Sequence, residues 1–171
     1  MTFHRIPDGL TFFSPSVLLA TWFGTGLIRP ASGSWGSLGG FIIGLMFLQY
    51  FPSTMLIIAA GFIYFIGLWA CRVWLLHAQL ADSENSEHAD PQAIVIDEVA
   101  GLWLALAMAP QTLTGYVAAF ILFRFFDITK IWPASWADQK LHGAHGIMLD
   151  DIIAGCWAVI ILLIARAFQL I

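Results

Sequence analysis

The feature that most constrains this chain is a long stretch without charge. Residues 30–71 contain no Asp, Glu, Lys or Arg. A membrane-crossing helix needs about 20 mainly apolar residues, so this stretch has room for two. Between the two lies a segment rich in turn-forming residues, Phe51-Pro52-Ser53-Thr54. We therefore expect an integral membrane protein.

The overall composition agrees with that expectation. Hydrophobic residues make up 60% of the 171 residues and charged residues 11%, whereas soluble domains use about 45–50% apolar residues. The net charge of -4 argues against a nucleic-acid partner. It comes largely from an acidic segment with Asp82, Glu84, Glu87 and Asp90. Cys71 and Cys156 form no Cys-x-x-Cys pair, so neither a disulfide framework nor a structural zinc site is indicated.

Hydrophobic stretches separated by Pro, Gly or charged clusters predict five helices. They lie at residues 38–51, 54–76, 93–110, 114–131 and 151–171. Residues 10–28 are a sixth candidate, but Pro15, Gly24 and Gly26 interrupt it, and we expect an interfacial or re-entrant segment there. The predicted fold is all-α: a polytopic membrane helical bundle of about five spans, forming a single domain over residues 1–171.

The predicted spans also fix which segments share a side of the membrane. If all five cross, the residues before 38, those around 76–92 and those around 132–150 lie on one side. Most of the basic residues lie in or beside these segments, namely Arg5, Arg29, Arg72, Lys130 and Lys140. The positive-inside rule makes this side cytoplasmic, with the N-terminus, Asp90 and Lys140 on it. Arg166 approaches the other side.

Asp97 and Glu98 form an acidic pair within apolar sequence. Burying such charges costs on the order of several kcal/mol per ion unless an opposite charge or hydrogen bonds compensate them. One interpretation is that Asp97 caps the following helix and Glu98 lies in its first turn. A cap needs one carboxylate, however, and two stand side by side. The pair is therefore a candidate for metal binding or catalysis.

Arg124, Asp127 and Lys130 follow one another at intervals of three residues, so neighbours in the series can interact on a helix. The series could form a buried ion-pair ladder. In the functional interpretation, Arg124 and Lys130 bind a phosphate group or anionic headgroup, and Asp127 binds a cation. Ionisable groups inside membrane segments are functional candidates by default.

A second acidic pair follows a glycine-containing segment. Residues 143–151 predict a flexible loop that brings Asp150 and Asp151 to the start of an apolar helix. One of them could be the N-cap. Carboxylates of this kind suit Mg²⁺, which prefers a few carboxylates together with water and phosphate oxygens. His142 and His145 are expected to be loop histidines rather than zinc ligands.

The segment before the first predicted helix is rich in glycine and serine. Gly33, Ser34 and Ser37 could supply backbone N–H groups and hydroxyls to an anion at a helix start. Alternatively, the small residues allow close helix packing, because Gly36 and Gly40 have the small-xxx-small spacing. Within this segment the two interpretations are equal. No Gly-x4-Gly-Lys-Ser/Thr loop, thiol-phosphatase motif or Asp-x-Asp occurs, so metal and carboxylates would have to perform any phosphate chemistry.

Four ordered motifs together resemble the phosphatidylglycerophosphatase A family over essentially the whole chain after the first twenty residues. The first is Phe23-Gly24-Thr25-Gly26-Leu27 with Gly33-Ser34-Trp35-Gly36-Ser37-Leu38, and the second is Asp90-Pro91 with Ile94-Val95-Ile96-Asp97-Glu98 and Gly101. The third is Phe123-Arg124-Phe125-Phe126-Asp127 with Lys130, Trp132 and Pro133, and the fourth is Gly143, Gly146-Ile147-Met148-Leu149-Asp150-Asp151 with Ala154-Gly155. Two positions depart from the family pattern, which usually has Pro in place of Ser32 and of Ile131.

The resemblance implies a magnesium-dependent phosphatase of the bacterial cytoplasmic membrane. Such an enzyme removes the terminal phosphate of phosphatidylglycerophosphate to give phosphatidylglycerol. On this interpretation the metal-binding and catalytic carboxylates are Asp97, Glu98, Asp127, Asp150 and Asp151. The expected phosphate contacts are Arg124, Lys130, Gly33, Ser34 and Ser37.

Two other classes of protein compete with this interpretation. A small transporter or channel could use the carboxylates as an ion pathway, but it would need polar residues spread through the membrane depth. A lipid-headgroup transferase is disfavoured because Asp8-Gly9 is followed by Leu10-Thr11-Phe12-Phe13 and not by an Asp-rich signature.

Overall fold

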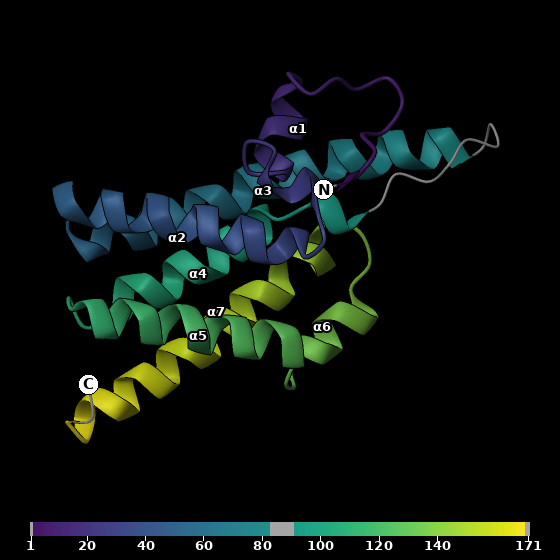
Figure 1. Cartoon of the computed structure of the whole chain (residues 1–171). Coiled ribbons are helices and arrows are strands. Elements are labelled where there is room, and N and C mark those ends of the chain that lie inside the picture. The colour runs from purple at the N-terminus through teal and green to yellow at the C-terminus, as the bar shows by residue number, and fades with distance from the viewer. Residues whose placement is uncertain (1, 83–90, 170–171) are drawn as a thin grey trace.

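The computed structural model describes residues 2–82 and 91–169, and within them the chain is helical apart from one short strand pair (Figure 1). The α-helices are α1 (Pro15–Ala20), α2 (Ser32–Tyr50), α3 (Ser53–Asp82), α4 (Ile96–Met108), α5 (Leu113–Thr129), α6 (Ala134–Lys140) and α7 (Ala144–Ala167). Two 3-10 turns are η1 (Thr25–Leu27) and η2 (Pro91–Ala93), and the strands are β1 (Thr2–Phe3) and β2 (Ile28–Arg29). Glu84, Glu87 and Asp90 of the acidic segment lie outside the described residues.

Helix α4 is the centre of the bundle. It packs against α2, α3, α5 and α7, and ten of its thirteen residues are buried. Burial on all sides explains why its sequence is apolar almost throughout, since a helix without a solvent-facing stripe needs no polar face. In Figure 1, α2, α4 and α5 lie side by side and α7 crosses behind them. The acidic pair of α4 is thus placed at one end of a crowded helix.

Each of the five predicted hydrophobic stretches forms a helix. The prediction for the last one is wrong at its start, because α7 begins at Ala144 and not at residue 151. Residues 144–150 continue the helical hydrogen-bonding pattern with Gly143 as the N-cap, so the segment predicted as a flexible loop is the first two turns of α7. Asp150 and Asp151 lie within the helix and cannot be its cap.

Residues 10–28 do not form one long helix. They contain the short helix α1, the turn η1 and the beginning of β2. Strand β2 pairs antiparallel with β1, with Thr2 opposite Arg29, which the sequence did not predict. Trp22, Phe23 and Gly24, which lie between α1 and η1, all have positive φ. Pro15 is the first residue of α1, and Gly24 is the N-cap of η1, so both interruptions lie at the start of a short element.

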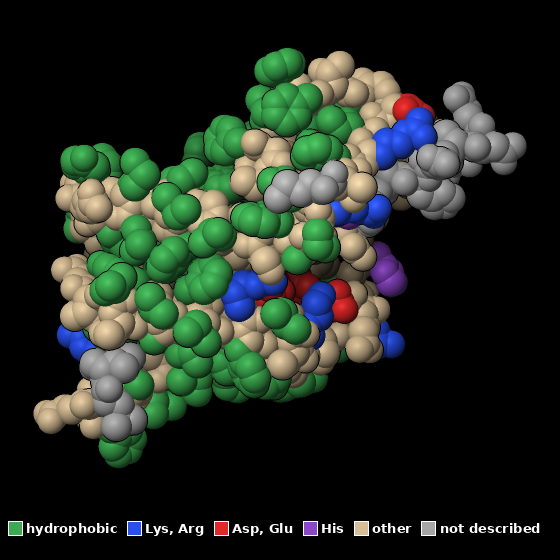
Figure 2. Space-filling model, in the orientation of Figure 1, with side chains coloured by type: hydrophobic (Ala, Val, Ile, Leu, Met, Phe, Trp, Pro, Cys, Tyr) green, Lys and Arg blue, Asp and Glu red, His purple; other side chains and the backbone are tan. Residues whose placement is uncertain are grey.

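Two of the described helices are long and apolar enough to cross a membrane by length and composition, over Ser53–Leu80 and Ala144–Ala167. The surface supports a membrane setting. Large hydrophobic side chains are exposed along α3, including Ile58 (72%), Phe62 (66%) and Phe65 (70%). Figure 2 shows hydrophobic side chains over much of one face, with one mixed group of basic and acidic side chains near its middle and other charged side chains at its edges. Exposed apolar area of this extent marks a surface that contacts lipid or another protein.

Glycines set the spacing between α4 and its neighbours. A Cβ at Gly155 on α7 would lie 2.5 Å from the carbonyl oxygen of Gly101 on α4. On the other side of α4, a Cβ at Gly36 or Gly40 of α2 would crowd Val95 or Val99. For Gly36 and Gly40 the structure thus supports the close-packing interpretation.

Candidate functional site

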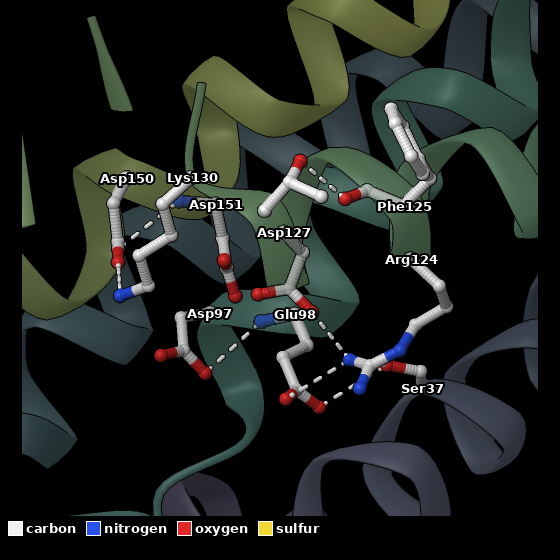
Figure 3. Close-up of polar contacts among 10 residues, drawn as sticks. Ser37, Asp97, Glu98, Arg124, Phe125, Asp127, Lys130, Asp150 and Asp151 are labelled. Carbon is white, nitrogen blue, oxygen red and sulfur yellow. Dashed lines mark hydrogen bonds and ion pairs between the residues drawn. The ribbon is translucent and has the colours of Figure 1, made fainter. Parts of the chain in front are cut away.

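The three acidic segments predicted from the sequence meet at one end of the bundle (Figure 3). Asp97 and Glu98 come from the first turn of α4, Asp127 from the last turns of α5, and Asp150 with Asp151 from α7. Asp151 is close enough to the other four to interact electrostatically with each of them. Residues far apart in the sequence therefore form a single carboxylate cluster.

Asp97 and Glu98 take up different positions in this cluster. The N-cap of α4 is Val95, so Asp97 is not the cap, although its Oδ1 accepts a hydrogen bond of 3.0 Å from the backbone N–H of Glu98. That contact satisfies one orphan donor of the helix start. Glu98 points instead toward α2 and α5, where it meets Ser37 and Arg124. The helix-capping interpretation is thus wrong about the N-cap and right that Glu98 lies in the first turn of α4, but it does not explain the contacts of Glu98 with Ser37 and Arg124.

Arg124 connects three elements of the site. Its Nη1 lies 3.2 Å from Glu98 Oε1 and 2.5 Å from Asp127 Oδ2, and it donates a 3.0 Å hydrogen bond to Ser37 Oγ. Ser37 Oγ in turn donates to Glu98 Oε2 at 3.1 Å. The predicted neighbour pair Arg124 and Asp127 is therefore present. It belongs to a network that also includes α2 and α4.

Lys130 holds the other end of the cluster. It is the C-cap of α5 in a left-handed conformation, with φ of 45°. Its Nζ donates to Asp138 at 2.5 Å and to Asp150 at 2.7 Å. Partial burial lowers the pKa of Lys130, but its bonds to Asp138 and Asp150 outweigh burial and raise the pKa above the ordinary value. The ammonium group therefore stays charged at neutral pH.

The glycine- and serine-rich start of α2 contributes through packing and through one hydroxyl. A Cβ at Gly33 would overlap Glu98 Oε1, so the absence of a side chain lets Glu98 approach α2. Ser34 is exposed and lines a cavity, whereas Ser37 is fully buried within the network. Ser32, at one of the positions that depart from the family pattern, donates a 2.7 Å hydrogen bond to the backbone carbonyl of Gln92. That bond ties the start of α2 to η2.

Two cavities meet at Glu98. The first, about 420 Å³, is bordered by acidic side chains and Lys130, and we call it the acidic cavity; its carboxylates are Asp97, Glu98, Asp127, Asp138, Asp150 and Asp151. The second, about 820 Å³, is bordered by Arg29, Arg124, His4 and the start of α2, and we call it the arginine cavity. Gln92, Ile94 and Glu98 border both. The two cavities therefore adjoin each other at these three residues.

The donor chemistry of the acidic cavity fits a hard divalent cation such as Mg²⁺, which binds carboxylate oxygens. Among the residues described, no three His, Cys, Asp or Glu side chains are already arranged as a metal-ligand set. Several carboxylates instead form ion pairs within the protein. Glu98 and Asp127 pair with Arg124, and Asp150 pairs with Lys130. Among the contacts described, neither Asp97 nor Asp151 forms an ion pair with a Lys or Arg side chain, and both residues are buried.

The sequence predictions missed two residues of the site and described two histidines as loop residues that do not bind zinc. Asp138 on α6 bonds Lys130, and Arg29 borders the arginine cavity, but neither lies in an acidic pair or a helical charge series. His142 borders the acidic cavity from the segment before α7. The prediction of a loop histidine is wrong for His145, which lies in the first turn of α7 and contacts Arg72 at 2.8 Å.

The fold and the site together define an all-helical protein with lipid-suited surfaces and a carboxylate- and arginine-rich site at one end of its bundle. Residues 18–166 match the model of the family described as phosphatidylglycerophosphatase A. The chain belongs to the phosphatidylglycerophosphatase A family. The resemblance drawn from the four motifs is confirmed.

Curated relatives agree over most of their length. A Haemophilus influenzae protein named phosphatidylglycerophosphatase A is 36% identical over 99% of this chain and 100% of its own. An Escherichia coli protein of the same name is 36% identical over 85% of this chain and 80% of its own. A Bacteroides thetaiotaomicron protein provisionally named a phosphatidylinositol-3-phosphatase is 34% identical over 88% of this chain and 92% of its own. No solved structure matches the chain.

Proposed function

We propose that this protein hydrolyses the terminal phosphate monoester of phosphatidylglycerophosphate to give phosphatidylglycerol and inorganic phosphate. The observation that carries the proposal is the meeting of five carboxylates from α4, α5 and α7 with Arg124 and Lys130 around two adjoining cavities. The names of the Haemophilus influenzae and Escherichia coli relatives support the same reaction.

We propose Mg²⁺ as the cofactor, held by carboxylates of the cluster. Among the residues described, the acidic cavity has six carboxylates on its border and one ammonium group, that of Lys130. So many like charges in a partly buried space are costly unless a cation offsets them. Asp97, Asp127, Asp150 and Asp151 are the residues that would hold the ion, with Glu98 beside them. When bound, such an ion offsets phosphate charge and lowers the pKa of bound water.

The protein's own groups can perform the remaining tasks. Arg124 offers a planar guanidinium to phosphate oxygens, a geometry suited to two parallel hydrogen bonds. Ser37 and Glu98 fix the orientation of Arg124 before substrate arrives. One carboxylate then either takes a proton from the attacking water or attacks phosphorus itself to form an aspartyl-phosphate, which water later hydrolyses to inorganic phosphate. In both routes the bond between phosphorus and the glycerol oxygen breaks, and that oxygen takes up a proton and leaves as the hydroxyl group of phosphatidylglycerol. In both routes Arg124 and Lys130 stabilise negative charge as it develops on the transferred phosphate.

We propose that the chain is a single multi-pass domain of the bacterial cytoplasmic membrane, with α2, α3, α4, α5 and α7 crossing and the site on the cytoplasmic side. The starts of α2, α4 and α7 converge at the site. Ser53, residues 107–111 and Arg166 gather around another cavity, at the ends of the same helices away from the site. The thirteen residues of α4 measure about 20 Å at 1.5 Å per residue, less than a ~30 Å hydrocarbon core. The neighbours of α4 would therefore enclose it within the membrane.

The transporter alternative fits the structure less well. The buried acidic residues of the described chain are Asp97, Asp150 and Asp151, and all three belong to the same cluster. An ion pathway would need polar groups at successive depths. The central helix α4 is instead filled with buried apolar side chains beyond its first turn.

Phosphate release tests the proposal directly. Purified full-length protein in detergent is given phosphatidylglycerophosphate with Mg²⁺, and again after exhaustive chelation. We expect release of inorganic phosphate with Mg²⁺, its loss on chelation and its recovery on adding Mg²⁺ back. Full turnover after chelation would remove the metal from the proposal. Absence of release under every metal condition would refute the phosphatase assignment.

A further inference from the structure

We propose that the substrate lipid reaches the site from the side, between α2 and α5, with its terminal phosphate at Arg124 and an acyl chain along the outer surfaces of the two helices. The inference rests on the proposed function, because a phospholipid keeps its acyl chains in the membrane while its headgroup reacts. The carboxylate cluster must therefore be reachable from the bilayer. The boundary between α2 and α5 has the chemistry that such a route requires.

Two contacts mark this boundary, which we call the α2–α5 seam. The rings of Phe41 on α2 and Phe120 on α5 lie 5.1 Å apart, measured between their centroids. One helical turn nearer the site, Arg124 Nη1 donates a hydrogen bond of 3.0 Å to Ser37 Oγ. The side chain of Arg124 is 16% exposed, so part of it can be reached from the surface.

The outer sides of the seam are apolar. On α5, Ile121 lies one turn before Arg124 and Ile128 one turn after it, so all three are on the same side of the helix. Ile121 is 60% exposed and Ile128 is 70% exposed. On α2, Leu38 follows Ser37 and is 41% exposed. In Figure 2 the mixed charged group lies between α2 and α5, with hydrophobic side chains beside it. A phosphate at Arg124 therefore has apolar surface next to it.

The directions of the two helices set the orientation of the lipid. Helix α2 begins at the site and α5 ends there, so α2 leads away from the site after Ser37 and α5 approaches it up to Arg124. An acyl chain then lies beside Ile121, on the membrane side of Arg124. The headgroup lies on the other side, toward Ser34 and Ile128, which are both exposed and border the arginine cavity.

A phospholipid fits this surface better than a purely apolar partner does. The seam places a guanidinium beside exposed apolar side chains, and a phospholipid places a phosphate beside acyl chains. The exposed stripe on α3 with Ile58, Phe62 and Phe65 differs, because it lies within residues 30–71, which contain no Asp, Glu, Lys or Arg. We therefore expect the α3 stripe to contact lipid chains without preference for a headgroup, and the seam to select a lipid with a phosphate monoester.

The test measures which lipid lies against each surface of the purified full-length protein in phosphatidylcholine vesicles with Mg²⁺. A fluorophore is attached to Ile121→Cys, or to Phe62→Cys on the α3 stripe, in a background without Cys71 and Cys156. A minor fraction of the lipid has brominated acyl chains, which quench the fluorophore on contact. This fraction is either phosphatidic acid, which has a phosphate monoester, or phosphatidylcholine. At position 121 we expect phosphatidic acid to be enriched about tenfold over phosphatidylcholine, as for a hydrogen bond to a charged group. At position 62 the two lipids should quench equally.

The controls separate headgroup binding from general lipid contact. Phe62 is matched to Ile121, because each lies in the third turn of a helix that begins at the end of the bundle away from the site. Arg124→Gln removes the charge and should reduce the enrichment at position 121 to less than about twofold. Arg124→Lys keeps the charge without the planar fork and should give an intermediate enrichment. It also replaces Arg124→Gln if that variant does not accumulate.

The outcomes separate this inference from the proposed function. Equal quenching by the two lipids at position 121 overturns the inference, and so does enrichment that persists in Arg124→Gln. Enrichment at Phe13→Cys, in the exposed N-terminal segment, with none at position 121 also overturns it, because the lipid then enters elsewhere. If enrichment at position 121 depends on Arg124 but phosphatidylglycerophosphate releases no phosphate, the lipid route stands and the phosphatase assignment fails. Phosphate release without this enrichment leaves the phosphatase assignment in place and removes the route.

Discussion

Gly101 on α4 lies against the backbone carbonyl of Asp151 on α7, and a Cβ at position 101 would overlap that oxygen. One helical turn earlier, Asp97 on α4 lies in the same carboxylate cluster as Asp151. Close contact of the two backbones is thus what brings two acidic side chains from different helices into one site. A larger residue at 101 would have to move α7 away from α4.

Gly101→Ala should therefore damage the site through its spacing. We expect a loss of stability of about 1–3 kcal/mol from overpacking. Phosphate release should fall about a hundredfold, because displacements near 1 Å can cost that much in rate. Thermal unfolding in detergent and phosphate release measure the two effects. Gly61→Ala is the matched control, since a Cβ there meets nothing within 4 Å; equal activity losses in both variants would contradict the spacing argument.

Asp97→Asn, Asp127→Asn and Asp151→Asn separate catalytic carboxylates from structural ones. Each substitution preserves size and removes the negative charge. A helix cap would lose at most about 1 kcal/mol of stability, whereas a group that stabilises the transition state is worth roughly 2.7 to 4 kcal/mol, or a hundred- to a thousandfold in rate. We expect the larger loss in phosphate release at saturating Mg²⁺, with normal accumulation in the membrane.

The control for these three variants is Asp8→Asn, because Asp8 is half-exposed and pairs with Arg5 away from both cavities. It should retain wild-type activity, as exposed ion pairs contribute about 0–1 kcal/mol. Two results would show that the three carboxylates have a structural role: near-normal phosphate release from the site variants, or loss of activity only because the variant proteins do not accumulate in the membrane.

Ser37→Ala tests whether the buried hydroxyl orients Arg124. Removing it deletes the hydrogen bond from Arg124 and the one to Glu98. We expect phosphate release to fall about tenfold, since hydrogen bonds to charged groups are worth roughly 1.5–3 kcal/mol and the direct pair of Arg124 with Glu98 remains. Thr129→Ala, whose hydroxyl bonds the Phe125 carbonyl on its own helix, should change the rate little. A wild-type rate for Ser37→Ala would leave Ser37 without a positioning role.

Membrane topology can be tested with single cysteines. In a background without Cys71 and Cys156, cysteines at position 140 and near the N-terminus should resist an impermeant thiol reagent added outside intact cells, because the five-span arrangement makes them cytoplasmic. A cysteine replacing Gln111, at the turn between α4 and α5, should react. Labelling at 140 but not at 111 would reverse the proposed orientation. Asp90, predicted on the same side as 140, lies outside the described residues.

Local sequence determined the helices and the chemical groups of this protein. Each of the five apolar stretches is a helix, since uninterrupted apolar sequence between Pro, Gly and charged clusters has few other structures in an apolar environment. The acidic pairs and the spacing of Arg124 and Asp127 picked out side chains that the structure brings together, because ionisable groups in apolar sequence are costly unless they meet partners.

Tertiary structure decided how those groups are arranged. Ser37 and Glu98 are 61 positions apart, and Arg124 is 87 positions from Ser37, so no local pattern relates them. The start of α7 at Ala144 was missed because Gly143 and Gly146 read as a loop; in the structure, Gly143 is the N-cap of α7, and a Cβ at Gly146 would overlap the carbonyl of Leu141. The placing of Arg29 depends on β1 and on His4, and that of Asp138 on α6. Such contacts depend on which helices pack together and how closely, and the closeness here is set by glycines whose neighbours lie on other helices.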